Sequence, residues 1–169
     1  IWVPQNIHVE LCLDGVEIIT NASASHHELR KLDKRLQLIR ACSARNECVY
    51  MYANQKGGDG GRLYFDGTSL VAVNGDLVAQ LPQFSLDDVE VSLSIIDLEQ
   101  VRARRAASMS RGNQAGIVKS FARVQANIEI CCECEPGSLS KIRPAAVHDP
   151  LEEIALGPPI WMWDYLRRS

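Results

Sequence analysis

The chain has no long hydrophobic run and no block of charge of one sign. No apolar stretch approaches the ~20 residues that a membrane span requires, and the N-terminus lacks the charged and apolar regions of a secretory signal. We therefore expect a soluble, cytoplasmic protein that makes no membrane contact. Acidic and basic residues are mixed along the sequence, with a formal net charge of −3. No basic surface is available to neutralise a phosphate backbone, so nucleic-acid binding is disfavoured.

The six cysteines favour neither disulfide bonds nor a metal site. The chain is neither short nor visibly secreted, so a disulfide framework is not expected. Cys12, Cys42 and Cys48 each stand among aliphatic residues, where a thiol behaves as a small hydrophobic side chain. The run Cys131–Cys134 holds the other three, but a structural zinc site needs four ligands at ordered spacing. We expect buried reduced thiols and no bound metal.

Alternating strands and helices are predicted in the first third of the chain. Residues 15–20 and 48–53 are short apolar runs, which are typical of buried strands. Between them, from 28 to 44, apolar residues recur at spacings of three and four, which predicts an amphipathic helix. A helix between two strands implies a right-handed crossover and a parallel pair. The length of 169 residues suits one domain that buries roughly 70% of its unfolded surface.

Further strands are predicted at 63–65, 69–73, 77–80 and 89–96. Asn74 and Gly75, between the second and third of these, are the strongest two-residue signal for a hairpin. Asp97 is then predicted to cap a helix over 98–109, with Gln100 as its partner in a capping box. Two sheets with helices on their outer faces account for this order.

The last third of the sequence has weaker signals. Glycine and proline punctuate residues 111–147, and only 124–130 resembles a strand. We expect an irregular segment there that links domains or covers a sheet edge. Later, Gly157, Pro158 and Pro159 are predicted to end one helix and to begin another at residue 160.

Two runs carry a resemblance to a known family. In Met51–Gly67 a strand leads through a glycine loop into a second strand, and Gln83–Val91 follows. Together they resemble the amide-hydrolysing, nitrilase-fold domain of glutamine-dependent NAD+ synthetases, most strongly the eukaryotic type. The resemblance extends from Ile1–Pro4 to Trp161–Arg168. It implies an α/β fold, the nitrilase-type α-β-β-α four-layer sandwich, truncated at its N-terminus because half of each sheet would precede Ile1.

The resemblance also implies an organisation along the chain. Residues 1–125 would form the C-terminal half of the nitrilase-like glutaminase domain, 126–150 a connector, and 151–169 the start of the ATP-dependent synthetase domain. The family's catalytic cysteine lies in a Cys-Glu-Glu-Leu-Trp-x-Pro stretch, whose Leu-Trp matches Ile1 and Trp2. Its Cys-Glu-Lys triad would therefore precede this segment, which is expected to hold no catalytic residue and to be inactive alone.

Ser25 and Lys31 are the predicted substrate-binding residues. Loops at strand ends commonly hold binding groups, and residues 21–25 are predicted to form such a loop. In related bacterial enzymes a serine at the position of Ser25 contacts glutamine, and an arginine contact falls where this chain has Lys31. A lysine meets a carboxylate as a point charge, without the bidentate fork of arginine. The alternatives are that Ser25 caps the following helix and that Lys31 is a solvated charge.

Other conspicuous residues favour structural roles. His26 and His27 are adjacent and so are poorly placed to chelate one ion. Asn21 begins a glycosylation sequon that we expect to be unused, because it stands at a strand end. The glycines of 57–61 lack the lysine and the helix of a phosphate-binding loop, so a connecting loop is expected. Asp87–Asp88 is interpreted as a turn and an oligomer contact.

The implied activity belongs to the whole family protein. Glutamine would be hydrolysed to release ammonia, which would amidate deamido-NAD+ to NAD+ at the expense of ATP. The resemblance implies no cofactor in this segment, ATP and Mg²⁺ in the synthetase domain, glutamine and deamido-NAD+ as small-molecule partners, and a homo-oligomer. Two alternatives stay open: a fragment of another nitrilase-superfamily amidohydrolase, or a non-catalytic truncated interaction module.

Overall fold

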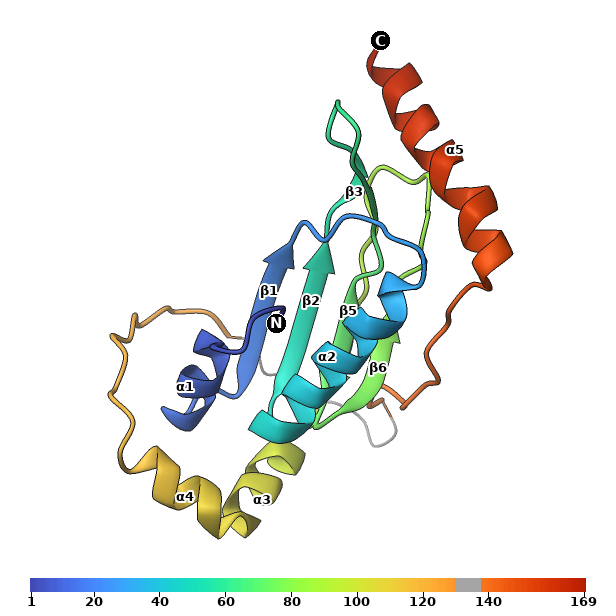
Figure 1. Cartoon of the computed structure of the whole chain (residues 1–169). Coiled ribbons are helices and arrows are strands. Elements are labelled where there is room, and N and C mark those ends of the chain that lie inside the picture. Colours follow the sequence, from blue (N-terminus) through green and yellow to red (C-terminus); the bar gives the residue numbers. More distant parts are fainter. Residues whose placement is uncertain (130–137) are drawn as a thin grey trace.

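A four-stranded mixed sheet forms the centre of the computed structural model, which describes residues 1–129 and 138–169. Its strands, in spatial order, are β1 (Ile18–Ser23), β2 (Val49–Asn54), β5 (Leu70–Val73) and β6 (Asp76–Gln80). Two short strands, β3 (Lys56–Gly58) and β4 (Tyr64–Asp66), pair separately beyond one end of this sheet (Figure 1). Helix α2 (Lys31–Asn46) crosses one face of the sheet and connects β1 to β2.

The strand pairing confirms the predicted crossover and hairpin. β1 and β2 are parallel, with Ile18 opposite Val49. β5 is antiparallel to both β2 and β6. Asn74 and Gly75 join β5 to β6 with φ angles of 51° and 96°, and two positive φ values in succession are the requirement of a type I′ turn.

Helix α2 begins later than its hydrophobic pattern predicts. Arg30 has a φ of 65°, in the left-handed region, so it cannot continue a right-handed helix. Leu29 consequently lies outside the helix and is half exposed. Leu32, Leu36 and Ile39 are buried against the sheet, and full burial of each such side chain contributes about 1.5–3 kcal/mol.

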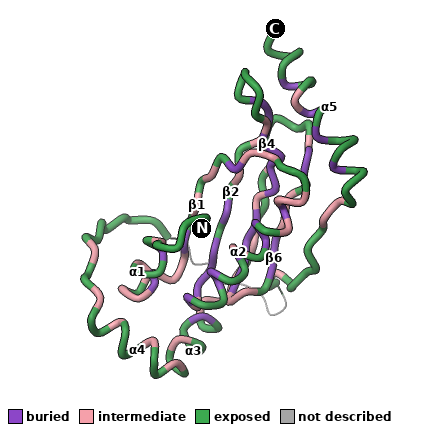
Figure 2. Tube along the Cα trace, in the orientation of Figure 1, coloured by how far each residue is buried: buried purple, intermediate pink, exposed green. Residues whose placement is uncertain are grey.

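The sheet buries side chains on both faces. Tyr50, Tyr52 and Leu70 join the apolar stripe of α2 in one cluster. On the opposite face, Val49 and Val71 pack with Val101 of helix α3 (Glu99–Ala107). Figure 2 shows that buried positions concentrate on the strands and α2, whereas helix α4 (Met109–Ala115) is largely exposed. Helix α1 (Ile7–Leu13) contributes Cys12 to the cluster beneath α2.

Two predicted strands are wrong. Residues 89–96 form no strand, and Val89, Val91 and Leu93 are strongly exposed. Residues 124–129 are also irregular, and the rest of that predicted strand lies outside the described residues, as does the Cys131–Cys134 cluster. A β-strand is stabilised by pairing with a neighbour, and these segments have no paired strand within the described ranges.

The predicted loop after the first strand is also corrected. β1 continues through Ser23, so Asn21 lies within the strand and its amide donates to the Tyr50 hydroxyl at 2.8 Å. At the start of α3, Asp97 accepts a hydrogen bond from the Glu99 N–H at 2.9 Å, but Leu98 is the N-cap residue. The predicted capping box with Gln100 is therefore not formed.

Helix α5 (Pro150–Arg168) runs through the predicted break at Pro158 and Pro159. Asp149 caps it, accepting hydrogen bonds from the Leu151 and Glu152 N–H groups. The helix lies along β3 and β4 (Figure 1). Its buried residues are Glu153, Gly157, Ile160 and Asp164. These spacings of three and four place them on one face, so tertiary packing overrides the helix-breaking tendency of the two prolines.

In the part of the chain that the structure describes, every helix is too short or too polar to span a bilayer.

Replacement of Gly75 by alanine is predicted to destabilise the β5–β6 hairpin by roughly 1–3 kcal/mol. Its φ is positive, and an added Cβ would lie 2.8 Å from the Cβ of Ala44. Hydrogen exchange of the β5 and β6 amides in the full-length protein measures the change. Gly112→Ala is the matched control, because nothing lies within 4 Å of its added Cβ. Equal protection in the two variants would contradict the prediction.

Candidate functional site

Polar side chains gather where β1 and β2 end. The two strands are parallel, with Ser23 opposite Asn54, so their carboxyl ends meet at one edge of the sheet. Ligands of open α/β sheets bind at such an edge. After β1 the chain crosses this edge and enters α2 (Figure 1). This crossing segment, residues 24–30 with the first residue of α2, Lys31, is called the edge loop, and it contains both predicted substrate-binding residues.

Asn54 holds the backbone of Ser25 in the edge loop. The Asn54 Oδ1 accepts a hydrogen bond from the Ser25 N–H at 2.9 Å. Its Nδ2 donates to the Ser25 carbonyl at 3.1 Å and to the Gly67 carbonyl at 2.9 Å. One carboxamide therefore pairs both backbone groups of Ser25, as a neighbouring strand would. This pairing fixes Ser25, which is buried.

A buried ion pair lies directly beneath Ser25. Arg35 Nη2 is 2.9 Å from Asp66 Oδ1, and Arg35 Nη1 is 3.3 Å from Oδ2. The two side chains are 0% and 1% exposed. Arg35 Nη2 also lies 3.4 Å from both the hydroxyl and the carbonyl oxygen of Ser25. Gln83 completes the set by donating to Asp66 Oδ2 at 2.8 Å. Removal of one partner from a buried pair costs about 3–5 kcal/mol.

The helix-capping interpretation of Ser25 is wrong. The N-cap residue of α2 is Arg30, five positions later. Arg30 adopts the left-handed conformation without being glycine, which costs about 1–3 kcal/mol unless its surroundings compensate. The edge loop is therefore held in a strained shape.

Lys31 lies at the outer side of the edge loop. Its ammonium is 2.9 Å from Glu28 Oε1 and 5.6 Å from the centroid of the Trp2 ring. The side chain is 15% exposed, so it is not a freely solvated charge. Lys34 also approaches the Trp2 ring, at 5.9 Å. No hydrogen bond or ion pair joins Ser25 to Lys31 among the described residues.

The two histidines have different environments. His26 Nε2 lies 2.7 Å from Glu28 Oε1. His27 stacks on Tyr64 with ring centroids 5.2 Å apart, and its Nδ1 is 2.9 Å from the Tyr64 hydroxyl. The described residues contain no group of three or more His, Cys, Asp or Glu side chains that could hold a metal ion.

Helix α5 supplies two buried carboxylates to this region. Glu153 accepts hydrogen bonds from the Arg30 N–H at 2.9 Å and from its guanidinium at 3.0 Å. Asp164 Oδ2 accepts from the Gly58 N–H at 2.7 Å. A Cβ at Gly57 would come within 3.0 Å of the Asp164 carboxyl, so this approach requires glycine. The segment 57–61 is predicted from the sequence to be a connecting loop. Its first two residues instead belong to strand β3, and α5 packs against that strand.

The carboxylates near α5 are paired with cations. Arg167 binds Asp88, which the sequence interpretation assigned to an oligomer contact, and also Asp164. Burial opposes ionisation of Asp164, yet the Gly58 N–H and Arg167 hold its carboxyl pKa below the usual value. At the edge loop, hydrogen bonds from Lys31 and then His26 lower the pKa of Glu28. Burial raises the pKa of Tyr64.

The three cysteines in the described ranges lie away from the edge loop. Cys12, Cys42 and Cys48 are free and buried, as predicted. Burial raises the pKa of Cys42 to about 11. The pKa of Cys12 is lowered, first by a hydrogen bond with Cys48 and then by Arg105 and Arg111. They pack in the apolar cluster beneath α2.

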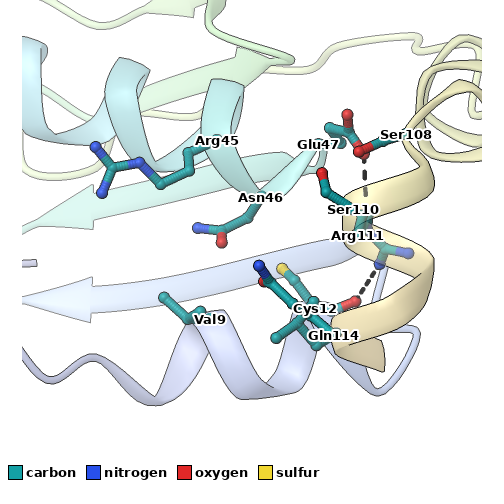
Figure 3. Close-up of a pocket in the computed structure, with 10 residues that line it drawn as sticks. Val9, Cys12, Arg45, Asn46, Glu47, Ser108, Ser110, Arg111 and Gln114 are labelled. Carbon is teal, nitrogen blue, oxygen red and sulfur yellow. Dashed lines mark hydrogen bonds and ion pairs between the residues drawn. The ribbon is translucent and has the colours of Figure 1, made fainter. Parts of the chain in front are cut away.

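A cavity of about 280 Å³ lies at the opposite end of the sheet (Figure 3). Val9 of α1, Asn46 of α2 and Arg111 of α4 line it together with Cys12 and Glu47. These residues precede β1 and β2 or come from α4, so the cavity is at the amino ends of the strands. It shares no residue with the edge loop.

The edge loop is suited to binding rather than to nucleophilic attack. A serine nucleophile needs a base in hydrogen-bond contact, and within the described residues the Ser25 hydroxyl contacts only the Arg35 cation. The sequence interpretation missed Arg35, Asn54, Asp66 and Glu153. Arg35 stands beside Leu36 and three residues after Leu32, and this helical spacing is a signal of the buried stripe that the sequence interpretation did not use. The contacts of the other three come from chain segments that are distant in sequence.

Comparisons with known proteins agree with this architecture. The family model of carbon-nitrogen hydrolases matches residues 1–106. A carbon-nitrogen hydrolase structure from Helicobacter pylori shares the fold, with a TM-score of 0.50 and 18% identity over 71% of this chain and 47% of its own. These findings confirm the α/β nitrilase-type fold class.

Close relatives are glutamine-dependent NAD+ synthetases. The Saccharomyces cerevisiae protein is 54% identical over 99% of this chain and 24% of its own length. The Homo sapiens protein is 46% identical over 100% of this chain and 24% of its own length. The chain thus spans about a quarter of the length of these curated relatives. By its match over residues 1–106, the chain belongs to the carbon-nitrogen hydrolase family.

Proposed function

We propose that this chain is part of a glutamine-dependent NAD+ synthetase and holds glutamine at its edge loop. The observation that carries the proposal is the 54% identity to the Saccharomyces cerevisiae synthetase across 99% of the chain. The parent protein would be a ligase whose glutaminase domain releases ammonia from glutamine. That ammonia would amidate deamido-NAD+ in an ATP-dependent reaction.

Ser25 and Lys31 have separate roles in the proposal. Ser25 forms a hydrogen bond with a charged group of glutamine, because Asn54 and Arg35 fix it at the carboxyl edge of the sheet. Lys31 attracts the α-carboxylate. Its ammonium lies beside Trp2, which matches the stretch that follows the nucleophile in the family. Two binding groups of different charge would orient glutamine without taking part in the bond-breaking step.

The rest of the reaction is assigned to other parts of the full-length protein. We assign residues 1–125 to the glutaminase domain, 126–150 to a connector and 151–169 to the start of the synthetase domain. ATP and Mg²⁺ would bind in that synthetase domain, and the protein would act as a homo-oligomer. Purified full-length protein should form NAD+ from deamido-NAD+, ATP and Mg²⁺ with either glutamine or ammonia as the nitrogen donor. Failure with both donors would reject the proposal.

Ser25→Ala is predicted to weaken the use of glutamine by about 10- to 150-fold, since a hydrogen bond to a charged group contributes roughly 1.5–3 kcal/mol. NAD+ synthesis from free ammonia should be nearly unchanged, because ammonia bypasses the glutamine pocket. The measurement is kcat/KM for each donor in the full-length protein. Ser23→Ala, two residues earlier in β1, is the control. An equal loss with both donors would show that Ser25 has a structural role only.

Lys31→Gln is predicted to raise the KM for glutamine roughly tenfold, because one charge interaction with a carboxylate is lost. Lys34→Gln is a closely matched control, since both ammonium groups approach the same Trp2 ring. Steady-state kinetics with glutamine and with ammonia distinguish a loss of glutamine binding from a loss of activity with both nitrogen donors. A similar KM in the two variants would remove Lys31 from the pocket.

A further inference from the structure

The edge loop contains one residue whose backbone needs outside support. Arg30 has a φ of 65° and a ψ of 7°, and its peptide leads directly into Lys31, the first residue of α2. A side chain other than glycine adopts this conformation only when the surroundings over-determine it. The direction of the Lys31 side chain therefore depends on whatever holds Arg30.

Glu153 holds Arg30 from a helix that is 123 positions away in sequence. Its Oε2 accepts from the Arg30 backbone N–H at 2.9 Å, and its Oε1 accepts from the Arg30 guanidinium at 3.0 Å. His27, also in the edge loop, has its Nε2 3.4 Å from the same carboxylate. The Glu153 side chain is 0% exposed. Both carboxylate oxygens are engaged and buried, so the bond from the backbone N–H is a strong, charge-assisted one. The Arg30 guanidinium is 39% exposed and also donates to Asp33.

Helix α5 is anchored at a second point near its other end. Asp164 accepts from the Gly58 N–H at 2.7 Å, and Gly57 allows the close approach. In between, Gly157 packs on Tyr64, whose hydroxyl would be 2.6 Å from an added Cβ. Tyr64 in turn stacks on His27 of the edge loop. The helix and the edge loop are therefore joined by two contacts, one through Glu153 and one through Tyr64, and both involve His27.

We propose that Glu153 is a positioning residue that holds the edge loop in its glutamine-binding conformation. Glutamine affinity then depends on how α5 is seated against β3 and β4. The inference rests on the proposed function, because it requires glutamine to bind at Ser25 and Lys31. Glu153 itself does not touch the substrate.

The test compares Glu153→Ala and Glu153→Gln in the full-length protein. We expect Glu153→Ala to raise the glutamine KM roughly 10- to 100-fold through misplacement of the loop, with ammonia-driven synthesis retained. Hydrogen exchange of residues 24–34 should be faster. Glu153→Gln should be intermediate, because its amide oxygen still accepts from the Arg30 N–H. Glu10→Gln removes the same charge from an exposed position of helix α1 and should change neither KM nor exchange.

Three outcomes would overturn the inference. Unchanged exchange in Glu153→Ala would show that the carboxylate does not hold the loop, whatever the fate of the proposed function. Equal losses with glutamine and ammonia in Glu153→Gln, the shape-preserving variant, would show a merely structural role. Faster exchange with an unchanged glutamine KM would separate the loop from glutamine binding. In that case the kcat/KM of Ser25→Ala for glutamine decides between two conclusions. An unchanged kcat/KM would reject the proposed function as well, whereas a lowered kcat/KM would reject only the role of Glu153.

Discussion

The buried Arg35–Asp66 ion pair connects the helix, the strands and the loop of the candidate site. Arg35 comes from α2 and Asp66 from β4, and neither side chain reaches solvent. Charges without water are costly unless every hydrogen-bonding group is used. Asp66 also accepts from Gln83 and Asn54, and Arg35 also donates to the Gly67 carbonyl, although Arg35 Nε has no hydrogen-bond partner within the described residues. Ser25 is adjacent to this network, so its position follows from the requirement to satisfy a buried charge.

Buried charges that are paired with hydrogen-bond donors also hold helix α5 in place. Glu153 and Asp164 are carboxylates on the buried face of the helix, and each accepts a backbone N–H from a distant segment. The Glu153 contacts compensate for the strained backbone of Arg30, and the Asp164 contact is possible because Gly57 has no side chain. They also help to explain why Pro158 and Pro159 remain inside one helix. Their missing N–H groups weaken it locally, while contacts on both sides of the prolines hold the helix against β3 and β4.

Helical spacing and turn residues predict those elements of the fold whose conformation depends on residues that are near in sequence. The spacing of Leu32, Leu36 and Ile39 predicts α2, and Asn74-Gly75 predicts the hairpin. Among the wrong predictions, the strand at 89–96 and the helix break at 157–159 concern segments whose conformation depends on contacts with distant parts of the chain. For the site, Ser25 and Lys31 come from family resemblance and remain predictions. Asn54 and Glu153 could not be found in this way, because their roles arise from contacts 29 and 123 positions apart in the sequence.

The central claim is that glutamine binds at the carboxyl edge of β1 and β2. The most direct measurement is a crystal structure of the full-length protein, with its nucleophile replaced, in complex with glutamine. We expect the Ser25 hydroxyl to lie about 3 Å from a polar atom of glutamine and the Lys31 ammonium to face the α-carboxylate. Glutamine bound away from this edge, for example in the cavity between α1 and α4, with Ser25 and Lys31 making no contact to it, would contradict the account.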